Sequence, residues 1–439
     1  MNYSLKGMFR QIKTTFKNSF GNIIEWYDFS LYGYFATVIA SQFFTNESQF
    51  VALVATFGAF AAGFIARPIG AVFFGRLGDR LGRHYAMNLA IILMAVPTVV
   101  MAFLPDYSLI GIWAPILLVV VRLLQGLSAG GQFGNLMTIT SEEDNQTHRG
   151  FNLAIAYSTS VVGFLLASGV SFLTLELLPQ EWQYFAWRIP FALGFILLVL
   201  HFFFRENEKI QEEIKEEKST NLKRKPLKKL LKHYPGRLSL IIILSTTAMI
   251  LYYLDVTYMV TYMETQLHLS LATALAINTM SIVAMCIAMP LFGYMSDIYG
   301  RKRMHVIGYL ILLSCTIPLV MGMQTDSVYI VAIMVISMAV LTAMIQGVST
   351  PYYTEIFPPR VRATGCSIGF GFGASLSGFA PMLAAITMGY MSAATGLCIL
   401  LLIVGVIGLI IAIIIPNDQV ETRRLNCLNL DSSSKCNRI

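Results

Sequence analysis

Long apolar stretches recur along the whole chain, and short polar segments separate them. Each stretch is long enough to cross a hydrocarbon core about 30 Å thick, which takes roughly 20 helical residues. We predict that twelve of them are membrane-spanning helices. They are residues 19–44, 51–76, 84–104, 109–140, 150–178, 185–204, 236–263, 271–295, 303–323, 327–353, 361–389 and 392–415.

The length of these stretches favours helices over the strands of a membrane barrel. Barrel strands would be segments of about 10 residues with alternating polarity, whereas these runs are continuously apolar. Only helices and closed barrels satisfy the backbone in lipid. The sequence therefore predicts an all-α, multi-pass membrane protein.

Composition supports the same class. Of 439 residues, 56% are hydrophobic and 13% are charged, whereas a soluble domain is about 25% charged. The six cysteines contain no CxxC pair, and the six histidines fall at predicted helix ends or in loops without other metal ligands. No metal site or disulfide framework is expected.

Basic residues are distributed very unevenly. With the N-terminus in the cytoplasm, almost all of the 31 Lys and Arg residues fall in cytoplasmic segments, as the positive-inside rule requires. Arg188 lies near the opposite face, and Arg67 and Arg122 fall inside predicted helices. The net charge of +7 is thus a topology signal, so no nucleic-acid partner is expected. Both termini are predicted to be cytoplasmic.

One long hydrophilic stretch, residues 205–235, divides the chain. It separates a six-helix bundle at 19–204 from a second at 236–415, and residues 1–18 and 416–439 form cytoplasmic tails. The stretch is acidic first and then basic. It can serve as a plain tether or form an amphipathic surface helix.

A short motif occurs after both the second and the eighth predicted helix. Glycines in such a motif permit a tight turn and close helix approach, and Asp and Arg can form charge-assisted hydrogen bonds with neighbouring helix ends. We expect these contacts to latch one state of a gate, although two short turns with solvated charges are the alternative. The residues are Gly75, Asp79, Arg80, Gly82 and Arg83 in one copy and Gly293, Asp297, Gly300 and Arg301 in the other.

The repeated motif resembles the signature loop of the major facilitator superfamily. Four further blocks, at residues 21–29, 67–70, 122–131 and 187–191, resemble the metabolite:proton symporter family. The resemblance implies twelve helices in two six-helix bundles, alternating access, and proton-driven solute uptake across a bacterial inner membrane. A proton gradient would supply the energy, so no cofactor is expected, and we expect a monomer in the lipid bilayer.

Ionisable residues inside membrane helices are costly and are functional candidates by default. Glu25, Asp28 and Tyr32 fall on one face of the first helix. A carboxyl group in a low-dielectric cavity favours its neutral form, and a nearby cation favours the charged form. Arg122 and Arg67 are the expected counter-charges. Protonation would free an arginine to bind a substrate carboxylate, whereas the alternative is an ion pair that only holds helices together.

The fourth predicted helix has a small-residue face and a polar face. Gly126, Gly130 and Gly134 form a small-xxx-small face that is typical of close helix packing. Gln125 and Gln132 are on a different side, and we expect them to line the cavity.

Gln132 departs from the family pattern. Related symporters usually have a glutamate at this position, so a proton role for that glutamate would pass to Glu25 and Asp28 in this chain.

The seventh predicted helix places Tyr252 and Asp255 on one face. Asp255 can select a cationic group on the substrate or act as an extra proton site, and Tyr252 and Tyr253 can bracket a quaternary ammonium. The alternative is that Asp255 lies near the outer surface and is hydrated. Gln346, in the tenth helix, offers neutral hydrogen bonds to substrate.

The sequence thus predicts a solute:proton symporter, with a zwitterionic amino-acid-like solute or betaine favoured over an organic carboxylate. Transport of a larger metabolite such as a siderophore, or a transport-dead membrane sensor, are the alternatives. No nucleophile–base pair or phosphate-cradling loop is visible in the sequence, so an enzyme is not expected. A sensor would need an output domain, and the tail after Pro416 is short and has no heptads.

Overall fold

The computed structural model of the chain describes residues 20–81, 83–129, 149–205, 226–358 and 361–415. Every secondary-structure element in these ranges is helical. The elements in chain order are α2 (Phe20–Tyr34), α3 (Ala36–Phe43), α4 (Gln49–Leu81), α5 (Arg83–Phe103), α6 (Tyr107–Ile110), α7 (Trp113–Ala129), α9 (Arg149–Leu177), η1 (Gln180–Phe185), α10 (Arg188–Arg205), α12 (Pro226–His233), α13 (Pro235–Tyr253), η2 (Leu254–Tyr258), α14 (Met259–Thr265), α15 (Leu271–Tyr299), α16 (Arg301–Gly322), α17 (Val328–Glu355), α18 (Arg362–Ser377), α19 (Ala380–Met388) and α20 (Ala393–Ile414).

Each of the twelve predicted spans overlaps a helix. The first is interrupted at Phe35, between α2 and α3, and the eleventh is divided into α18 and α19. The seventh contains a π-helical turn, η2, between α13 and α14. Within the described ranges, eight helical segments are long and apolar enough to cross a membrane by length and composition. The all-α membrane fold is therefore confirmed.

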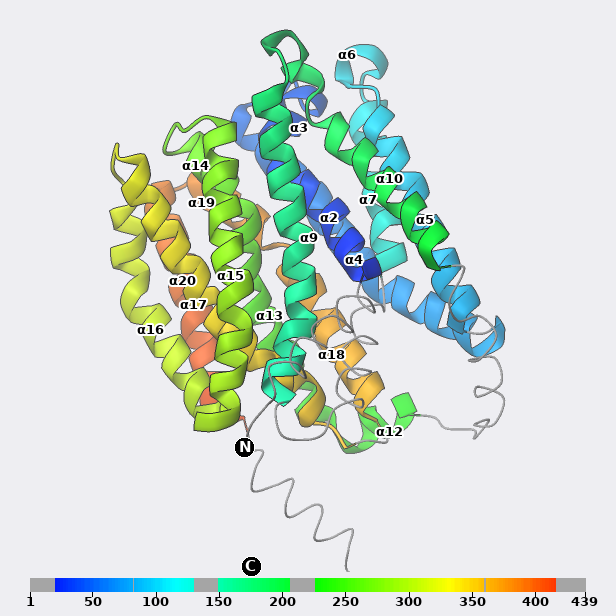
Figure 1. Ribbon diagram of the computed structural model, residues 1–439, viewed down its shortest axis with the longest axis vertical. Coiled ribbons are helices and arrows are strands. Elements are labelled where there is room, and N and C mark those ends of the chain that lie inside the picture. Colours follow the sequence, from blue (N-terminus) through cyan, green and yellow to red (C-terminus); the bar gives the residue numbers. More distant parts are fainter. Residues whose placement is uncertain (1–19, 82, 130–148, 206–225, 359–360, 416–439) are drawn as a thin grey trace, which may run out of the picture.

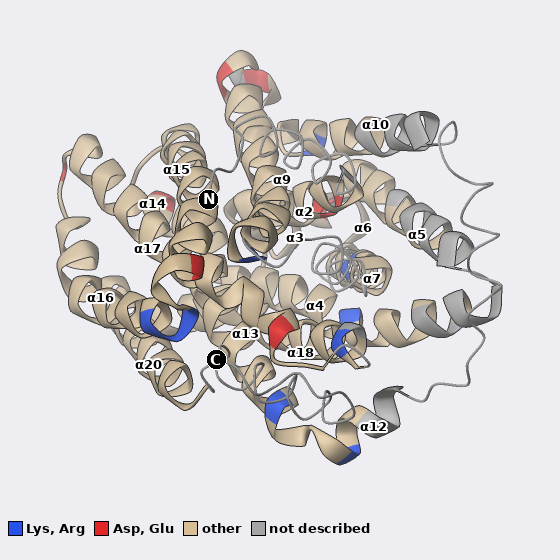
Figure 2. Ribbon diagram, turned by 60° about the horizontal axis from the view of Figure 1, so that its bottom comes forward, with Lys and Arg blue, Asp and Glu red and all other residues tan. Residues whose placement is uncertain are grey.

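The helices form two groups that lie side by side in Figure 1. Helices from α2 to α10 make up one group and those from α13 to α20 the other, with α9 and α15 adjacent where the groups meet. Short helix α6 marks the upper end of the molecule in this view, and α12 marks the lower end. Charged residues are sparse along the long helices in Figure 2.

The hydrophilic stretch at 205–235 is partly described. Its last part forms the short helix α12, in which Leu230 is buried and Lys232 is exposed. Residues 206–225 lie outside the described ranges, so the choice between tether and surface helix stays open for them.

Glycines bring α4 and α7 into backbone contact. A Cβ atom added at Gly126 would lie 1.8 Å from the carbonyl oxygen of Gly63, and one at Gly70 would lie 1.9 Å from that of Leu127. The predicted close packing at Gly126 is confirmed, while Gly130 and Gly134 lie outside the described residues. Because α4 carries Arg67 and α7 carries Arg122, this contact sets the spacing of the two intramembrane arginines.

Candidate functional site

Arg67 pairs with Glu25 across α4 and α2. Its Nη2 lies 3.8 Å from Glu25 Oε1, and both side chains are buried. The guanidinium also lies on aromatic rings, with its central carbon 4.2 Å from the centroid of Phe29 and 4.4 Å from that of Phe64. The long ion-pair distance leaves Arg67 Nε and Nη2 without hydrogen-bond partners in the described part of the chain.

Arg122 has no carboxylate partner among the described residues. Its side chain is 0% exposed, and none of its three guanidinium nitrogens forms a hydrogen bond there. The guanidinium carbon lies 3.7 Å from the centroid of the Tyr32 ring, which partly compensates the charge by a cation–π contact. Asp28 is a nearby negative charge, but it forms no direct ion pair with Arg122, so the guanidinium keeps all of its hydrogen-bond donors unused among the described residues.

Asp28 is held by an amide instead of an arginine. Gln125 Nε2 donates a hydrogen bond of 2.6 Å to Asp28 Oδ2, and Asp28 Oδ1 has no partner in the described residues. Gln125 is one turn from Arg122 on α7, because it lies three residues further along the helix. Arg122 and Arg67 were the expected counter-charges of the first-helix acids, and the direct contact of Asp28 is a hydrogen bond from Gln125 instead.

Both arginines lie near one aromatic ring, a contact that sequence reasoning did not identify. Phe29 is 4.2 Å from the guanidinium carbon of Arg67 and 5.8 Å from that of Arg122. Trp26 also contacts Arg67 at 4.7 Å. Aromatic residues next to the acids in the stretch from Trp26 to Phe29 were the available signal, since arginine stacks readily on aromatic faces.

Tyr252 and Asp255 do not share an environment, although they were expected on one face. The ring of Tyr252 packs on Phe164 of α9, with centroids 5.3 Å apart, whereas the hydroxyl beside Asp255 belongs to Thr342 of α17. The π-helical turn η2 has a wider hydrogen-bond pattern than an α-helix and so changes the register by about one residue. Asp255 is 0% exposed, which argues against the alternative of a hydrated carboxylate near the outer surface.

Tyr253 faces the aromatic cluster of the other half. Its ring centroid lies 5.0 Å from that of Phe64 and 6.4 Å from that of Trp26. The hydroxyls of Tyr252 and Tyr253 are buried and have no hydrogen-bond partner among the described residues. Aromatic faces and unused phenol groups therefore meet where the two halves come together.

The two predicted glutamine contacts have different outcomes. Gln346 Nε2 donates to the Ala248 carbonyl at 3.1 Å, and its Oε1 has no partner in the described ranges. Gln132 lies outside the described residues.

The second copy of the repeated motif joins the two halves at the lower end. Asp297 Oδ1 accepts a hydrogen bond from Gly150 N at 2.9 Å, and Asp297 Oδ2 accepts one from Phe151 N at 3.0 Å. Both donors belong to the first turn of α9, where unpaired N–H groups and the helix dipole favour an anion. Arg301 holds the same carboxylate at 3.1 Å and Glu355 at 2.6 Å.

The glycines of this copy perform the two predicted tasks. Gly300 has a φ of 92° between α15 and α16, a backbone conformation that favours glycine. A Cβ atom at Gly293 would lie 2.6 Å from Ala154 Cβ, so Gly293 permits the close approach of α15 and α9.

The first copy of the motif cannot be compared in the same way. The side chains of Gly75, Asp79, Arg80 and Arg83 and the whole of Gly82 lie outside the described residues.

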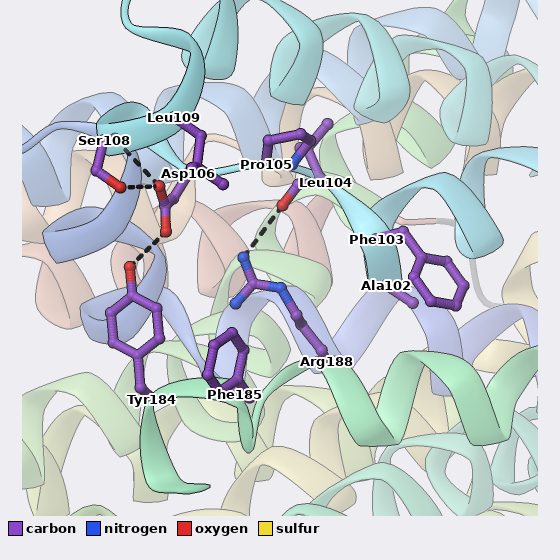
Figure 3. A pocket seen from close by; sticks show the side chains of 10 residues that line it. All are labelled: Ala102, Phe103, Leu104, Pro105, Asp106, Ser108, Leu109, Tyr184, Phe185 and Arg188. Carbon is purple, nitrogen blue, oxygen red and sulfur yellow. Dashed lines mark hydrogen bonds between the residues drawn. The ribbon is translucent and has the colours of Figure 1, made fainter. Parts of the chain in front are cut away.

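A polar cluster closes the upper end around a cavity of about 510 Å³. Figure 3 shows the hydroxyls of Ser108 and Tyr184 pointing at Asp106 from two sides, each with an oxygen–oxygen distance of 2.5 Å. Arg188 Nη2 donates to the Leu104 carbonyl at 3.1 Å. Burial alone would raise the pKa of Asp106, but the hydrogen bonds from Ser108, Tyr184 and backbone N–H groups hold that pKa below its usual range.

These contacts make Asp106 and Arg188 structural residues that connect the segment before α6 to η1 and α10. The charged groups at the centre of the molecule are different, because they are buried and incompletely paired. Two groups of membrane helices with buried charges on α2, α4 and α7 fit the architecture of a secondary transporter.

Comparison with known proteins identifies the family. The model of the Major Facilitator Superfamily matches residues 19–381 and 259–426. The glycine betaine/proline/ectoine/pipecolic acid transporter of Dickeya dadantii (strain 3937) is 30% identical, covering 83% of this chain and 75% of that protein. The alpha-ketoglutarate permease of Escherichia coli (strain K12) is 32% identical, covering 82% of this chain and 83% of that protein.

A solved structure has the same fold. The crystal structure of a D-xylose-proton symporter superposes with a TM-score of 0.74 at 18% identity and covers 92% of this chain and 98% of that chain. The chain belongs to the Major Facilitator Superfamily, and its relatives identify the metabolite:proton symporter family within it. The prediction of a transporter and not an enzyme is confirmed by this family.

Proposed function

We propose that the chain is a proton-coupled symporter for a small organic solute that bears a carboxylate. Arg122 carries the proposal, because its buried guanidinium lies on Tyr32 without a carboxylate or hydrogen-bond partner among the described residues. A guanidinium binds a carboxylate through two parallel hydrogen bonds. A substrate carboxylate would satisfy the charge that the protein leaves uncompensated.

The first-helix acids supply the proton coupling in this proposal. Protonation of Glu25 weakens its pair with Arg67, which is already long at 3.8 Å. Protonation of Asp28 removes a negative charge near Arg122 and leaves the contact with Gln125. Either event makes an arginine more available to the substrate, so proton and substrate binding reinforce each other.

A zwitterion of amino-acid or betaine type is the favoured solute, and an organic carboxylate is next. Tyr252 and Tyr253 support this choice, because their rings lie where the two halves meet and can attract a quaternary ammonium. Tyr32, Gln125 and Gln132 would line the substrate site beside Arg122. Gln346 would offer its free Oε1 as an acceptor. Asp255 does not share the environment of the tyrosines, and its contacts support the different role argued below.

The gate and the topology follow from the same proposal. We place the chain in a bacterial inner membrane as a monomer, with both termini in the cytoplasm and the Asp297 latch at the cytoplasmic end. The two halves, 19–204 and 236–415, would rock about the central site, joined by 205–235. Asp79 and Arg83 would form the equivalent latch of the first copy.

A binding screen tests the choice of solute first. Purified protein is heated with glycine betaine, proline, shikimate, alpha-ketoglutarate or citrate at millimolar concentration, because a ligand of the folded state raises the melting temperature. A shift with betaine or proline supports the zwitterion, and a shift with the acids alone supports the carboxylate. Arg122→Ala should abolish either shift.

Transport in proteoliposomes then tests the coupling. An inward proton gradient should drive accumulation of the solute that binds, and a protonophore should abolish it. Binding without accumulation would contradict symport in favour of a sensor. Neither binding nor accumulation of any small solute would contradict the proposal in favour of a larger metabolite such as a siderophore.

A further inference from the structure

Asp255 is a buried carboxylate for which the central site has no use. It lies in η2, inside the helical segment Pro235–Thr265 that is long and apolar enough to span a membrane. The side chain is 0% exposed, and neither Oδ1 nor Oδ2 accepts a hydrogen bond from a described residue. Thr342 of α17 is the neighbouring hydroxyl, and its Oγ1 also has no partner there.

No described cation compensates this carboxylate. The elements packed against η2 are α2, α13, α14, α17 and α19, together with α15 through Asn278 and α4 through Phe57. Helix α19 contains no titratable side chain. The charged and tyrosine side chains of the others are directed to other groups. They are Glu25 with Arg67, Asp28 with Gln125, Tyr27 with Pro190, Tyr32 with Thr56, Tyr34 with Phe164, Arg237 with Ile356, Tyr252 with Phe164, Tyr253 with Phe64, Tyr258 with Met388, Tyr262 with Gln324, Glu264 with Thr37, Tyr294 with Phe151, Asp297 with Arg301, Tyr352 with His305, Tyr353 with Phe370 and Glu355 with Arg301. Tyr299 and Tyr329 are exposed.

The charged form of Asp255 would be strongly disfavoured in this position. Removing an ion from water without a partner costs several kcal/mol, and the bilayer core provides no water to hydrate it. The neutral acid is a hydrogen-bond donor as well as an acceptor. It can donate to Thr342 Oγ1, a neighbouring hydroxyl that is unused among the described residues.

We propose that Asp255 is a second proton-binding site, located in the C-terminal half and separate from Glu25 and Asp28. In this state the acid holds its proton toward Thr342 of α17. Movement of η2 relative to α17 would expose the carboxyl group to water and let the proton leave. The π-helical turn supports this role, because such turns occur frequently at functional sites. The inference rests on the proposed proton coupling and adds a second proton to it.

Infrared spectroscopy of the full chain in lipid tests the site without transport. A protonated carboxyl group has its own carbonyl-stretch band, and Asp255→Asn should remove one such band at neutral pH. Asp106→Asn is the matched control, since Asp106 accepts hydrogen bonds outside the membrane helices, and it should leave the band unchanged. An identical band in the wild type and Asp255→Asn would overturn the proposal.

A second variant keeps the test decisive if Asp255→Asn does not fold. Thr342→Val leaves Asp255 in place and removes its hydrogen-bond acceptor, so the same band should move to higher frequency. The spectra are recorded with choline as the buffer cation, and replacing choline by sodium should leave the band intact. Loss of the band on adding sodium would overturn the proton site in favour of a metal-cation site.

The coupling ratio gives the functional result. The solute gradient that balances a known proton gradient in proteoliposomes reports protons carried per solute, and Asp255→Asn should lower that ratio by one proton. An unchanged ratio would contradict the second site while symport itself stands. If no solute accumulates at all, the proposed function fails, but the infrared result still decides the state of Asp255.

Discussion

At the scale of single residues, the unusual feature is a buried guanidinium without a direct ion pair or hydrogen bond among the described residues. Arg122 is buried on the ring of Tyr32, and a ring face compensates only part of a positive charge. The ring of Phe29 lies near both Arg122 and Arg67. A site with two buried arginines, one long ion pair and unused guanidinium donors has hydrogen bonds to offer to an anion.

Replacing Arg122 should remove substrate binding. Arg122→Ala deletes the anchor for a carboxylate, and Arg122→Lys keeps the charge but loses the planar, two-pronged geometry. We expect at least a tenfold weaker affinity for the lysine variant, about 1.4 kcal/mol, measured by calorimetric titration with the solute found in the binding screen. Lys232→Ala on α12 is the charge-matched control. Equal affinity in Arg122→Ala, Arg122→Lys and Lys232→Ala would refute the assignment.

Replacing Asp28 should separate coupling from binding. Asp28→Asn removes the titratable group but leaves an amide that can still contact Gln125. We expect proton-driven accumulation to be lost while exchange of labelled for unlabelled solute continues. Accumulation at the wild-type level would show that Asp28 is not a coupling residue and that its contact with Gln125 only holds α2 and α7 together.

At the scale of elements, backbone contact between α4 and α7 decides where the arginines lie. Gly126→Ala should disturb this contact, because the new Cβ would be 1.8 Å from the Gly63 carbonyl oxygen. Overpacking of this kind lowers the free energy of unfolding by roughly 1–3 kcal/mol.

Thermal unfolding in detergent measures the effect of Gly126→Ala. The control is Gly169→Ala in α9, where an added Cβ meets nothing within 4 Å. Its stability should be unchanged or slightly higher, since alanine is the better helix former by about 1 kcal/mol. Equal melting temperatures for the two variants would refute the packing role of Gly126.

The contact of Asp297 with α9 is an anion at a helix N-terminus. Asp297→Asn keeps one oxygen acceptor but removes the charge that the helix dipole and Arg301 favour. We expect the lower ends of α9 and α15 to separate more often, which spin labels on the two helices would report as a longer distance. An unchanged distance distribution, with solute transport intact, would refute the latch.

At the scale of the whole molecule, the two halves touch at both ends. The Asp297 contacts join them at the lower end, and Thr37 Oγ1 donates to Glu264 Oε2 at 2.7 Å to connect α3 with α14. At the upper end, Asp106 connects the segment before α6 to η1, through contacts within the first half. Because Asp106 is a titratable group in this upper cluster, the stability of the molecule should respond to pH there.

Acid should weaken the Asp106 cluster. Because hydrogen bonds from Ser108 and Tyr184 hold the pKa of Asp106 below its usual range, the charged form is favoured in the folded state. Its stabilising effect is present above the ordinary aspartate pKa of about 3.9 and is lost as pH falls through the lower folded-state pKa. Melting temperatures of the wild type and Asp106→Asn should differ at neutral pH and converge in acid, and a constant difference would refute the assignment.

The helices were predictable because their signal is local. Apolar runs of spanning length predicted twelve segments, each of which overlaps a helix, and Gly293 and Gly300 indicated the close approach and the turn. The breaks within helices were not visible. A π-helical turn at Leu254–Tyr258 depends on packing around it, and no residue type in that stretch requires it.

The sequence by itself determined that this is a helical membrane protein with a few charges inside, because apolar length and backbone satisfaction in lipid are properties of each segment. Only the tertiary structure decided which charges meet. Glu25 pairs with Arg67, Asp28 meets Gln125, and Arg122 is left on Tyr32. Contacts of 3–4 Å depend on the rotation and spacing of helices, and these are set by packing spread over residues far apart in the chain.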